Sequence, residues 1–141
     1  MKIAAIVPAF NEEKTIGPIL KELCNMKILD EIIVVSDGST DNTVAIARNY
    51  VKDYKVKVIE HKENMGKSQA VITGVNNTKA EIIIMLDADL IGLKESHIMA
   101  LLSPIINEDV TMTVGIFNHG RGSTDLAQKI APFLSGQRAV K

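Results

Sequence analysis

Short apolar runs alternate with helical patterns along this chain, and this alternation is the feature that most constrains its fold. Runs rich in Ile and Val indicate strands buried on both faces, whereas apolar residues spaced three and four apart indicate helices. The expected strands span residues 2–7, 31–35, 56–59, 81–86 and 111–117. The expected helices span residues 15–25, 43–50, 68–75, 95–108 and 126–134. The pattern predicts an α/β fold with a mostly parallel sheet and helices on both faces.

Three residues are expected to mark or interrupt these elements. Pro8 should end the first strand, and Pro104 should kink or divide the helix at 95–108, because proline lacks the backbone N–H that both structures use. Asp41 is suited to cap the helix at 43–50.

The composition excludes several classes of protein. The chain has 141 residues, enough for one domain, and its net charge is -1 with the two signs interleaved. A nucleic-acid groove is therefore not expected, and aromatic content of 4% gives no base-stacking platform. No apolar stretch approaches the roughly 18 residues of a membrane span. The start "MKIAAIVPAF" is interpreted as a strand and not a signal peptide, so a cytoplasmic protein is expected. The single cysteine, Cys24, is expected to be a reduced core residue, and a homo-oligomer is left open.

Three polar loops follow predicted strands: "PAFNEE" at 8–13, "SDGSTD" at 36–41 and "DADL" at 87–90. Taken singly, they are explained as an acidic first helical turn, a turn with an N-cap, and a solvated turn. Together they matter more, because the carboxyl ends of parallel strands share one edge of the sheet. Ligands of such folds bind at that edge, where the strand order reverses.

The residues of these loops suit a nucleoside diphosphate. The backbone of residues 8–11 can present N–H and C=O groups to a base edge. Glu12 and Asp37 are acceptors for ribose hydroxyls or a base N–H. Asp89, with Asp87 beside it, supplies the hard oxygen ligands that Mg²⁺ or Mn²⁺ prefers, and such a cation neutralises a departing diphosphate.

The segments "VPAFNEE", "VVSDGSTDNT", "NMGKSQA" and "IIIMLDADL" occur in the order and spacing that resemble glycosyltransferase family 2. The resemblance implies a GT-A, Rossmann-like fold and transfer of a sugar from a nucleoside-diphosphate sugar, with a UDP-sugar favoured, to an unknown acceptor. It also implies a DxD metal-binding motif at 87–89 and a lysine, Lys67, near the diphosphate. The remaining implied donor-binding residues are Pro8, Ala9, Asn11, Glu12, Asp37 and Asp87. Ser36 departs from the family pattern, in which many members carry an aspartate.

A looser resemblance covers "GRGSTDLAQKIAPFLSGQRA", which looks like the bacterial branch near glucosyl-3-phosphoglycerate synthases. Arg121 and Thr124 in this stretch could hold an anionic or phosphorylated acceptor, or could belong to a solvated loop. No catalytic base is nominated. The carboxylates after the DxD motif fit helix ends and caps instead, and they are Glu95, Glu108, Asp109 and Asp125.

Two alternatives remain at this point. The 141 residues are expected to form a single domain that lacks the C-terminal part of the acceptor half, so a catalytically incomplete nucleotide-sugar-binding domain is one alternative. A P-loop NTPase is the other, because "MGKS" at 65–68 resembles the end of a phosphate-binding loop. That loop would need a glycine where this chain has His61.

Overall fold

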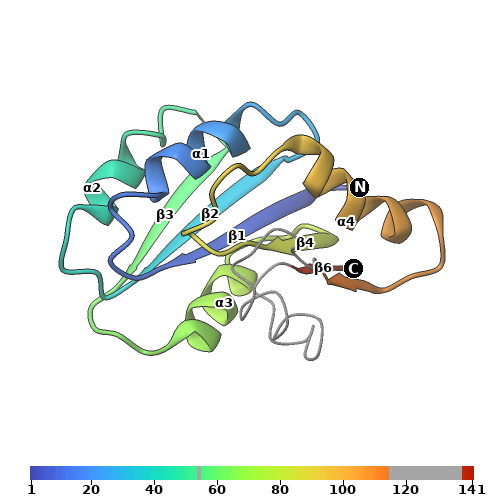
Figure 1. The fold of residues 1–141 in the computed structure, drawn as a ribbon. Coiled ribbons are helices and arrows are strands. Elements are labelled where there is room, and N and C mark those ends of the chain that lie inside the picture. The colour runs from blue at the N-terminus through green and yellow to red at the C-terminus, as the bar shows by residue number, and fades with distance from the viewer. Residues whose placement is uncertain (54, 115–137) are drawn as a thin grey trace, which may run out of the picture.

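One six-stranded sheet organises the chain (Figure 1). The computed structural model describes residues 1–53, 55–114 and 138–141. The strands are β1 (Ile3–Ala9), β2 (Glu31–Asp37), β3 (Val56–His61), β4 (Ile82–Met85), β5 (Met112–Val114) and β6 (Arg138–Val140). The helices are α1 (Ile16–Cys24), α2 (Thr43–Arg48), α3 (Lys67–Asn76) and α4 (Glu95–Asn107).

The strand order is β3-β2-β1-β4-β6-β5. Strands β1 to β4 are mutually parallel where they pair, and β6 runs antiparallel to both of its neighbours, β4 and β5. The sheet is therefore mixed but mostly parallel, which confirms the fold class expected from the sequence. Because the chain moves outward from β1 to β3 and then returns to place β4 on the other side of β1, the strand order reverses between β1 and β4.

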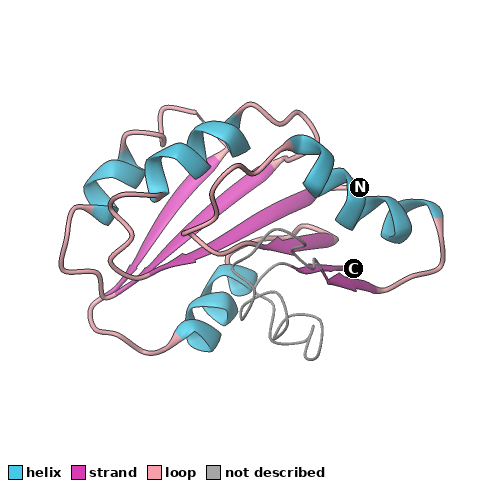
Figure 2. Cartoon of the chain, viewed as in Figure 1, coloured by secondary structure: helices cyan, strands magenta, loops and turns pink. Residues whose placement is uncertain are grey.

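Helices cover both faces of the sheet (Figure 2). Helices α1, α2 and α4 lie on one face, and their apolar residues join the larger core cluster with alternate residues of β1. Helix α3 covers the other face, where Ala70 packs in a smaller cluster with Ile33 and Val35. Gly74 of α3 lies so close to β1 that a Cβ at this position would be 2.6 Å from Cγ2 of Ile6. Both β1 and β2 are consequently buried along nearly their whole length.

The first strand was expected to end at Pro8, but β1 continues to Ala9. Its pairing with β2 extends to Ala9 and Ser36, whereas its pairing with β4 stops at Ile6 and Met85. Pro8 has no N–H to donate, so it can end one ladder while the strand continues along the other. The two central strands therefore separate at Pro8.

Pro104 and Asp41 were also expected to affect helix boundaries. Helix α4 is not divided at Pro104, because its buried residues on either side of the proline, Leu102 and Ile105, pack in the core. Asp41 precedes the N-cap of α2, and its carboxylate accepts a 2.9 Å hydrogen bond from the backbone N–H of Thr43.

Strand β6 was not predicted, because a three-residue strand carries no measurable period. Residues 115–117 of the expected fifth strand, and the helix expected at 126–134, lie outside the described residues.

Candidate functional site

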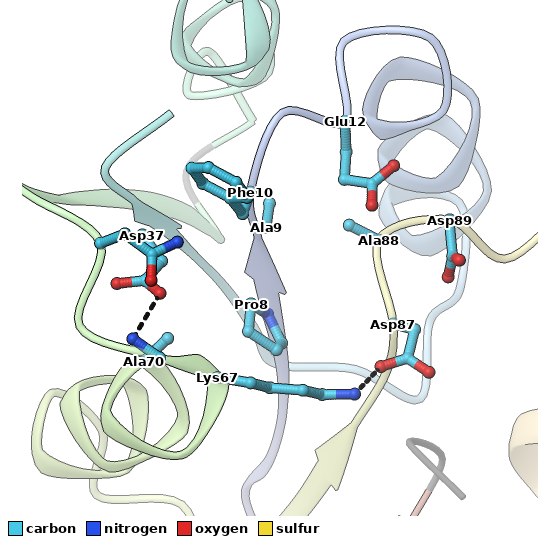
Figure 3. A pocket seen from close by; sticks show the side chains of 12 residues that line it. Pro8, Ala9, Phe10, Glu12, Asp37, Lys67, Ala70, Asp87, Ala88 and Asp89 are labelled. Carbon is cyan, nitrogen blue, oxygen red and sulfur yellow. Dashed lines mark hydrogen bonds and ion pairs between the residues drawn. The ribbon is translucent and has the colours of Figure 1, made fainter. Parts of the chain in front are cut away.

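A cavity of about 430 Å³ opens at the carboxyl ends of β1, β2 and β4, beside the start of α3 (Figure 3). It lies at the point where the strand order reverses, which is where α/β folds bind ligands. Its lining consists of Pro8, Ala9, Phe10, Glu12, Asp37, Asn64, Gly66, Lys67, Ala70, Asp87, Ala88 and Asp89. All three loops singled out in the sequence therefore contribute to one cavity.

Asp37, the last residue of β2, is held rigidly in the cavity wall. Its Oδ1 accepts hydrogen bonds from the backbone N–H of Met65 at 2.8 Å and from Nδ1 of His61 at 2.9 Å. Its Oδ2 accepts one from the N–H of Gly66 at 2.9 Å. Burial alone would raise the pKa of Asp37, but the three hydrogen bonds and the nearby imidazole outweigh it and lower the pKa. Asp37 is thus an ionised acceptor.

The same contacts argue against the P-loop alternative. In a P-loop the backbone N–H groups that precede the helix cradle phosphate. Here the N–H groups of Met65 and Gly66 point at the Asp37 carboxylate. Gly66 adopts a φ of 96°, which favours glycine, and Lys67 begins α3 directly after it.

Asn11 and Glu12 connect the loop after β1 to the loop after β2. Asn11 has a φ of 50°, a left-handed conformation that asparagine tolerates, and its Oδ1 accepts a 2.8 Å hydrogen bond from the N–H of Thr40. The N–H of Glu12 donates to Oγ1 of Thr43 at 2.8 Å. Asn11 is absent from the cavity lining, so its observed contacts fix the loop, while the Glu12 side chain faces the cavity.

Asp87 and Asp89 follow β4, with Leu86 between the end of the strand and Asp87. Ala88 between them is buried in the core, which fixes the segment while Asp87 and Asp89 remain at the cavity. Asp87 forms an ion pair with Lys67 from the start of α3. Figure 3 shows the Lys67 side chain extending across the cavity to reach it.

Negative charge is concentrated at this end of the cavity. The pKa of Glu12 is raised, first by burial and then by repulsion from Asp89, Asp41 and Asp87, and a hydrogen bond from Thr15 only partly opposes these effects. A cation placed among these carboxylates would relieve the repulsion.

The donor set also suits a hard divalent cation. Asp87 and Asp89 offer carboxylate oxygens, although no group of three His, Cys, Asp or Glu side chains among the described residues is arranged to hold a metal. Mg²⁺ is usually bound by one or two carboxylates together with substrate phosphates, so two aspartates that line a cavity together with Lys67 fit it.

Some residues singled out in the sequence are not part of this cavity. Arg121, Thr124 and Asp125 lie outside the described residues. The other carboxylates considered as a base, Glu95, Glu108 and Asp109, are exposed near the ends of α4 and do not line the cavity.

Phe10 and His61 are among the contributors to the site that were not predicted from the sequence. Phe10 lines the cavity with 46% of its surface exposed, and His61 supports Asp37 from behind. An aromatic residue inside "PAFNEE" was a usable signal for Phe10. Nothing in the sequence marked His61, because its role depends on the pairing of β2 with β3.

In the part of the chain that the structure describes, no helix is both long enough and apolar enough to cross a membrane.

Comparison with known proteins found relatives in sequence and in structure. A dolichyl-phosphate beta-glucosyltransferase of Trichomonas vaginalis is 42% identical over 94 residues, which cover 60% of this chain and 28% of that protein. The glucosyl-3-phosphoglycerate synthase of Mycobacterium tuberculosis in complex with UDP is 25% identical with a TM-score of 0.78, covering 99% of this chain and 56% of that one. The same synthase with Mn²⁺, UDP-glucose and phosphoglyceric acid is 24% identical, with a TM-score of 0.80 and the same coverage.

The chain thus spans less than a third of the curated relative and a little over half of the synthase chains. The sequence profile of Glycosyl transferase family 2 matches residues 4–138, nearly the whole chain. This chain therefore belongs to glycosyl transferase family 2.

Proposed function

We propose that this chain binds a nucleoside-diphosphate sugar, with UDP as the favoured nucleotide, together with Mg²⁺ or Mn²⁺, and that it serves transfer of the sugar to a phosphorylated acceptor. The observation that carries the proposal is the gathering of Glu12, Asp87 and Asp89 opposite Lys67 in a cavity at the strand-order reversal. Carboxylates that repel one another beside a lysine fit a site completed by a cation and a diphosphate.

The nucleoside end of the donor is assigned to the β1 and β2 side of the cavity. Asp37 and Glu12 accept hydrogen bonds from ribose hydroxyls or a base N–H, and the backbone of Pro8 and Ala9 faces the base edge. Phe10 offers an exposed aromatic face on which a base can stack.

The diphosphate end is assigned to the β4 side. A bound Mg²⁺ or Mn²⁺ supplies neutralisation of the charge that develops on the diphosphate as its bond to the sugar breaks. Asp87 and Asp89 would hold the cation. Lys67, 57% exposed at its side chain and now paired with Asp87, is within reach of the same phosphates and would exchange one anionic partner for another.

The nature of the acceptor rests on the relatives. The names of two of them include a phosphorylated compound, dolichyl phosphate in one and phosphoglyceric acid in the other. The bond that forms joins the sugar to an acceptor oxygen as the bond to the diphosphate oxygen breaks. Arg121 and Thr124 are proposed to bind the phosphate of the acceptor.

A thermal-shift screen tests the donor proposal directly. UDP-glucose, GDP-mannose, dTDP-glucose and ATP are each added to the chain with and without Mn²⁺. We expect UDP-glucose with Mn²⁺ to raise the melting temperature most, and Mn²⁺ alone to raise it little. Stabilisation by ATP alone would contradict the proposal and support the P-loop alternative.

A further inference from the structure

A chain of hydrogen bonds leads from the cavity wall into the protein behind it. It begins at Asp37 on β2, passes through His61 at the end of β3, and ends at Thr73 in α3. The Nδ1 of His61 is 2.9 Å from Oδ1 of Asp37, and its Nε2 is 2.8 Å from Oγ1 of Thr73. Asp37 and His61 are also direct partners in the pairing of β2 with β3. The side chains are 5% and 9% exposed, so water does not compete freely for these contacts.

The ionised carboxylate of Asp37 determines which nitrogen of His61 donates to it. An ionised carboxylate only accepts hydrogen bonds, so Nδ1 of His61 must carry a hydrogen and donate it to Asp37. The hydroxyl of Thr73 can donate to Nε2 or accept from it, so it holds the ring in either protonation state. The imidazole is therefore restrained at both nitrogens.

This restraint determines the direction in which Asp37 faces. Its Oδ1 already accepts from His61 and Met65, while Oδ2 accepts from Gly66 alone among the residues that the structure describes. A carboxylate has about four acceptor positions, so the capacity that remains is on Oδ2. Removing the Nδ1 donor would leave Oδ1 with one partner and let the carboxylate turn away from that arrangement.

We propose that His61 is a positioning residue for donor binding, which acts through Asp37 on the nucleoside end of the ligand and leaves the diphosphate end unaffected. The inference rests on the proposed function, because it needs a nucleotide in the cavity. It assigns His61 no contact with the ligand.

Two substitutions at His61 separate the two nitrogens. In His61→Asn, the side-chain amide nitrogen lies where Nδ1 was, so the donor to Asp37 is kept and the contact with Thr73 is lost. In His61→Gln, the longer side chain reaches toward Thr73, and the donor to Asp37 is lost. The pair therefore tests the Nδ1 donor with similar chemistry at both variants.

Binding is measured by isothermal titration calorimetry with two probes, UDP with Mn²⁺ and pyrophosphate with Mn²⁺. We expect His61→Asn to bind UDP within about threefold of the wild type. We expect His61→Gln to bind UDP about tenfold more weakly, the low end for loss of a hydrogen bond to a charged group. Pyrophosphate affinity should be the same in all three proteins.

Melting curves provide the control for a purely structural role. Such a role would lower the melting temperature of both variants and leave the UDP affinity of the folded protein unchanged. If His61→Gln does not fold, His61→Phe removes the same donor from a ring of similar shape, and its expected UDP affinity is the same.

Wild-type affinity for UDP in the glutamine variant would overturn the inference, as would equal losses for UDP and pyrophosphate. If the wild-type chain itself binds no UDP with Mn²⁺, the proposed function fails instead, so the two failures are distinguishable.

Discussion

Gly38 offers a quantitative test of how the cavity wall is built. It follows Asp37 and has a φ of 75°, and a Cβ at this position would lie 2.5 Å from the backbone N of Asn64 and 2.5 Å from the carbonyl carbon of Glu63. Both contacts are to backbone atoms that also line or flank the cavity, so they cannot be relieved by turning a side chain. We expect Gly38→Ala to be strongly destabilising.

The magnitude follows from two separable costs. A left-handed backbone costs a residue with a side chain about 1–2 kcal/mol, of which roughly 0.4–1 kcal/mol is offset because alanine stiffens the unfolded chain. Forcing an extra carbon into packed surroundings adds about 1–3 kcal/mol. Gly92 supplies the matched control, because its φ is 73° but a Cβ there would meet nothing within 4 Å.

Urea unfolding of the two alanine variants measures the difference. We expect Gly92→Ala to lose about 1 kcal/mol and Gly38→Ala to lose about 1–3 kcal/mol more, seen as a lower midpoint with an unchanged slope. Equal losses in the two variants would show that the segment at 63–64 yields freely, and would refute the argument that it is fixed against β2.

Four further predictions concern single side chains. Asp89→Asn should abolish the stabilisation by Mn²⁺ with UDP, which is about 2.7 kcal/mol when the ligand is at a hundred times its Kd. The melting temperature of the metal-free protein should stay equal or rise slightly. An undiminished shift in melting temperature would remove Asp89 from the metal site. Lys67→Ala should weaken UDP binding in calorimetry by about 1.5–3 kcal/mol and hardly change uridine binding, so equal losses would contradict its role. Burial would raise the pKa of Glu31, but contacts with Lys57 and other partners outweigh burial and lower the pKa. The ionised Glu31 therefore stabilises the folded protein above the unfolded pKa of about 4.3, and this stabilisation is lost as the pH falls through the folded pKa. The stability advantage of wild type over Glu31→Gln in urea should therefore shrink below about pH 4, and a constant difference from pH 3 to 7 would count against it. Burial raises the pKa of Cys24 to about 11, so alkylation by iodoacetamide at pH 8 should be slow until urea is added, whereas the rate of a free thiol would contradict this.

Much of the fold could be predicted because its signals are local. Ile- and Val-rich runs and helical spacing located β1 to β4 and α1 to α4, and the alternation implied parallel pairing. The predictions that were wrong concerned residues whose structure depends on the strands and helices packed around them. Pro8 continues a strand because only its β4 side lacks a partner, and Pro104 stays inside α4 because the core holds the helix on both sides of it.

The candidate site was predictable to a similar extent. Acidic residues after strands located Glu12, Asp37, Asp87 and Asp89, all of which line the cavity. Donor binding by Asn11 stays a prediction, and the structure shows that its side chain also joins two loops. The support of Asp37 by residues 61–66 was not predictable, since a hydrogen bond between a side chain and a distant loop leaves no pattern in the sequence.

The position of β6 has a consequence for the order in which the sheet can be completed during synthesis. Among the described strands, β5 is joined to the sheet only through β6, which pairs on its other side with β4. As the chain leaves the ribosome, β1 to β4 can associate once residue 85 has emerged. Met112–Val114 must wait until Arg138–Val140 has been made, although it is translated first. The half of the sheet that lines the cavity can therefore form early in translation, and the edge formed by β5 and β6 is added after it.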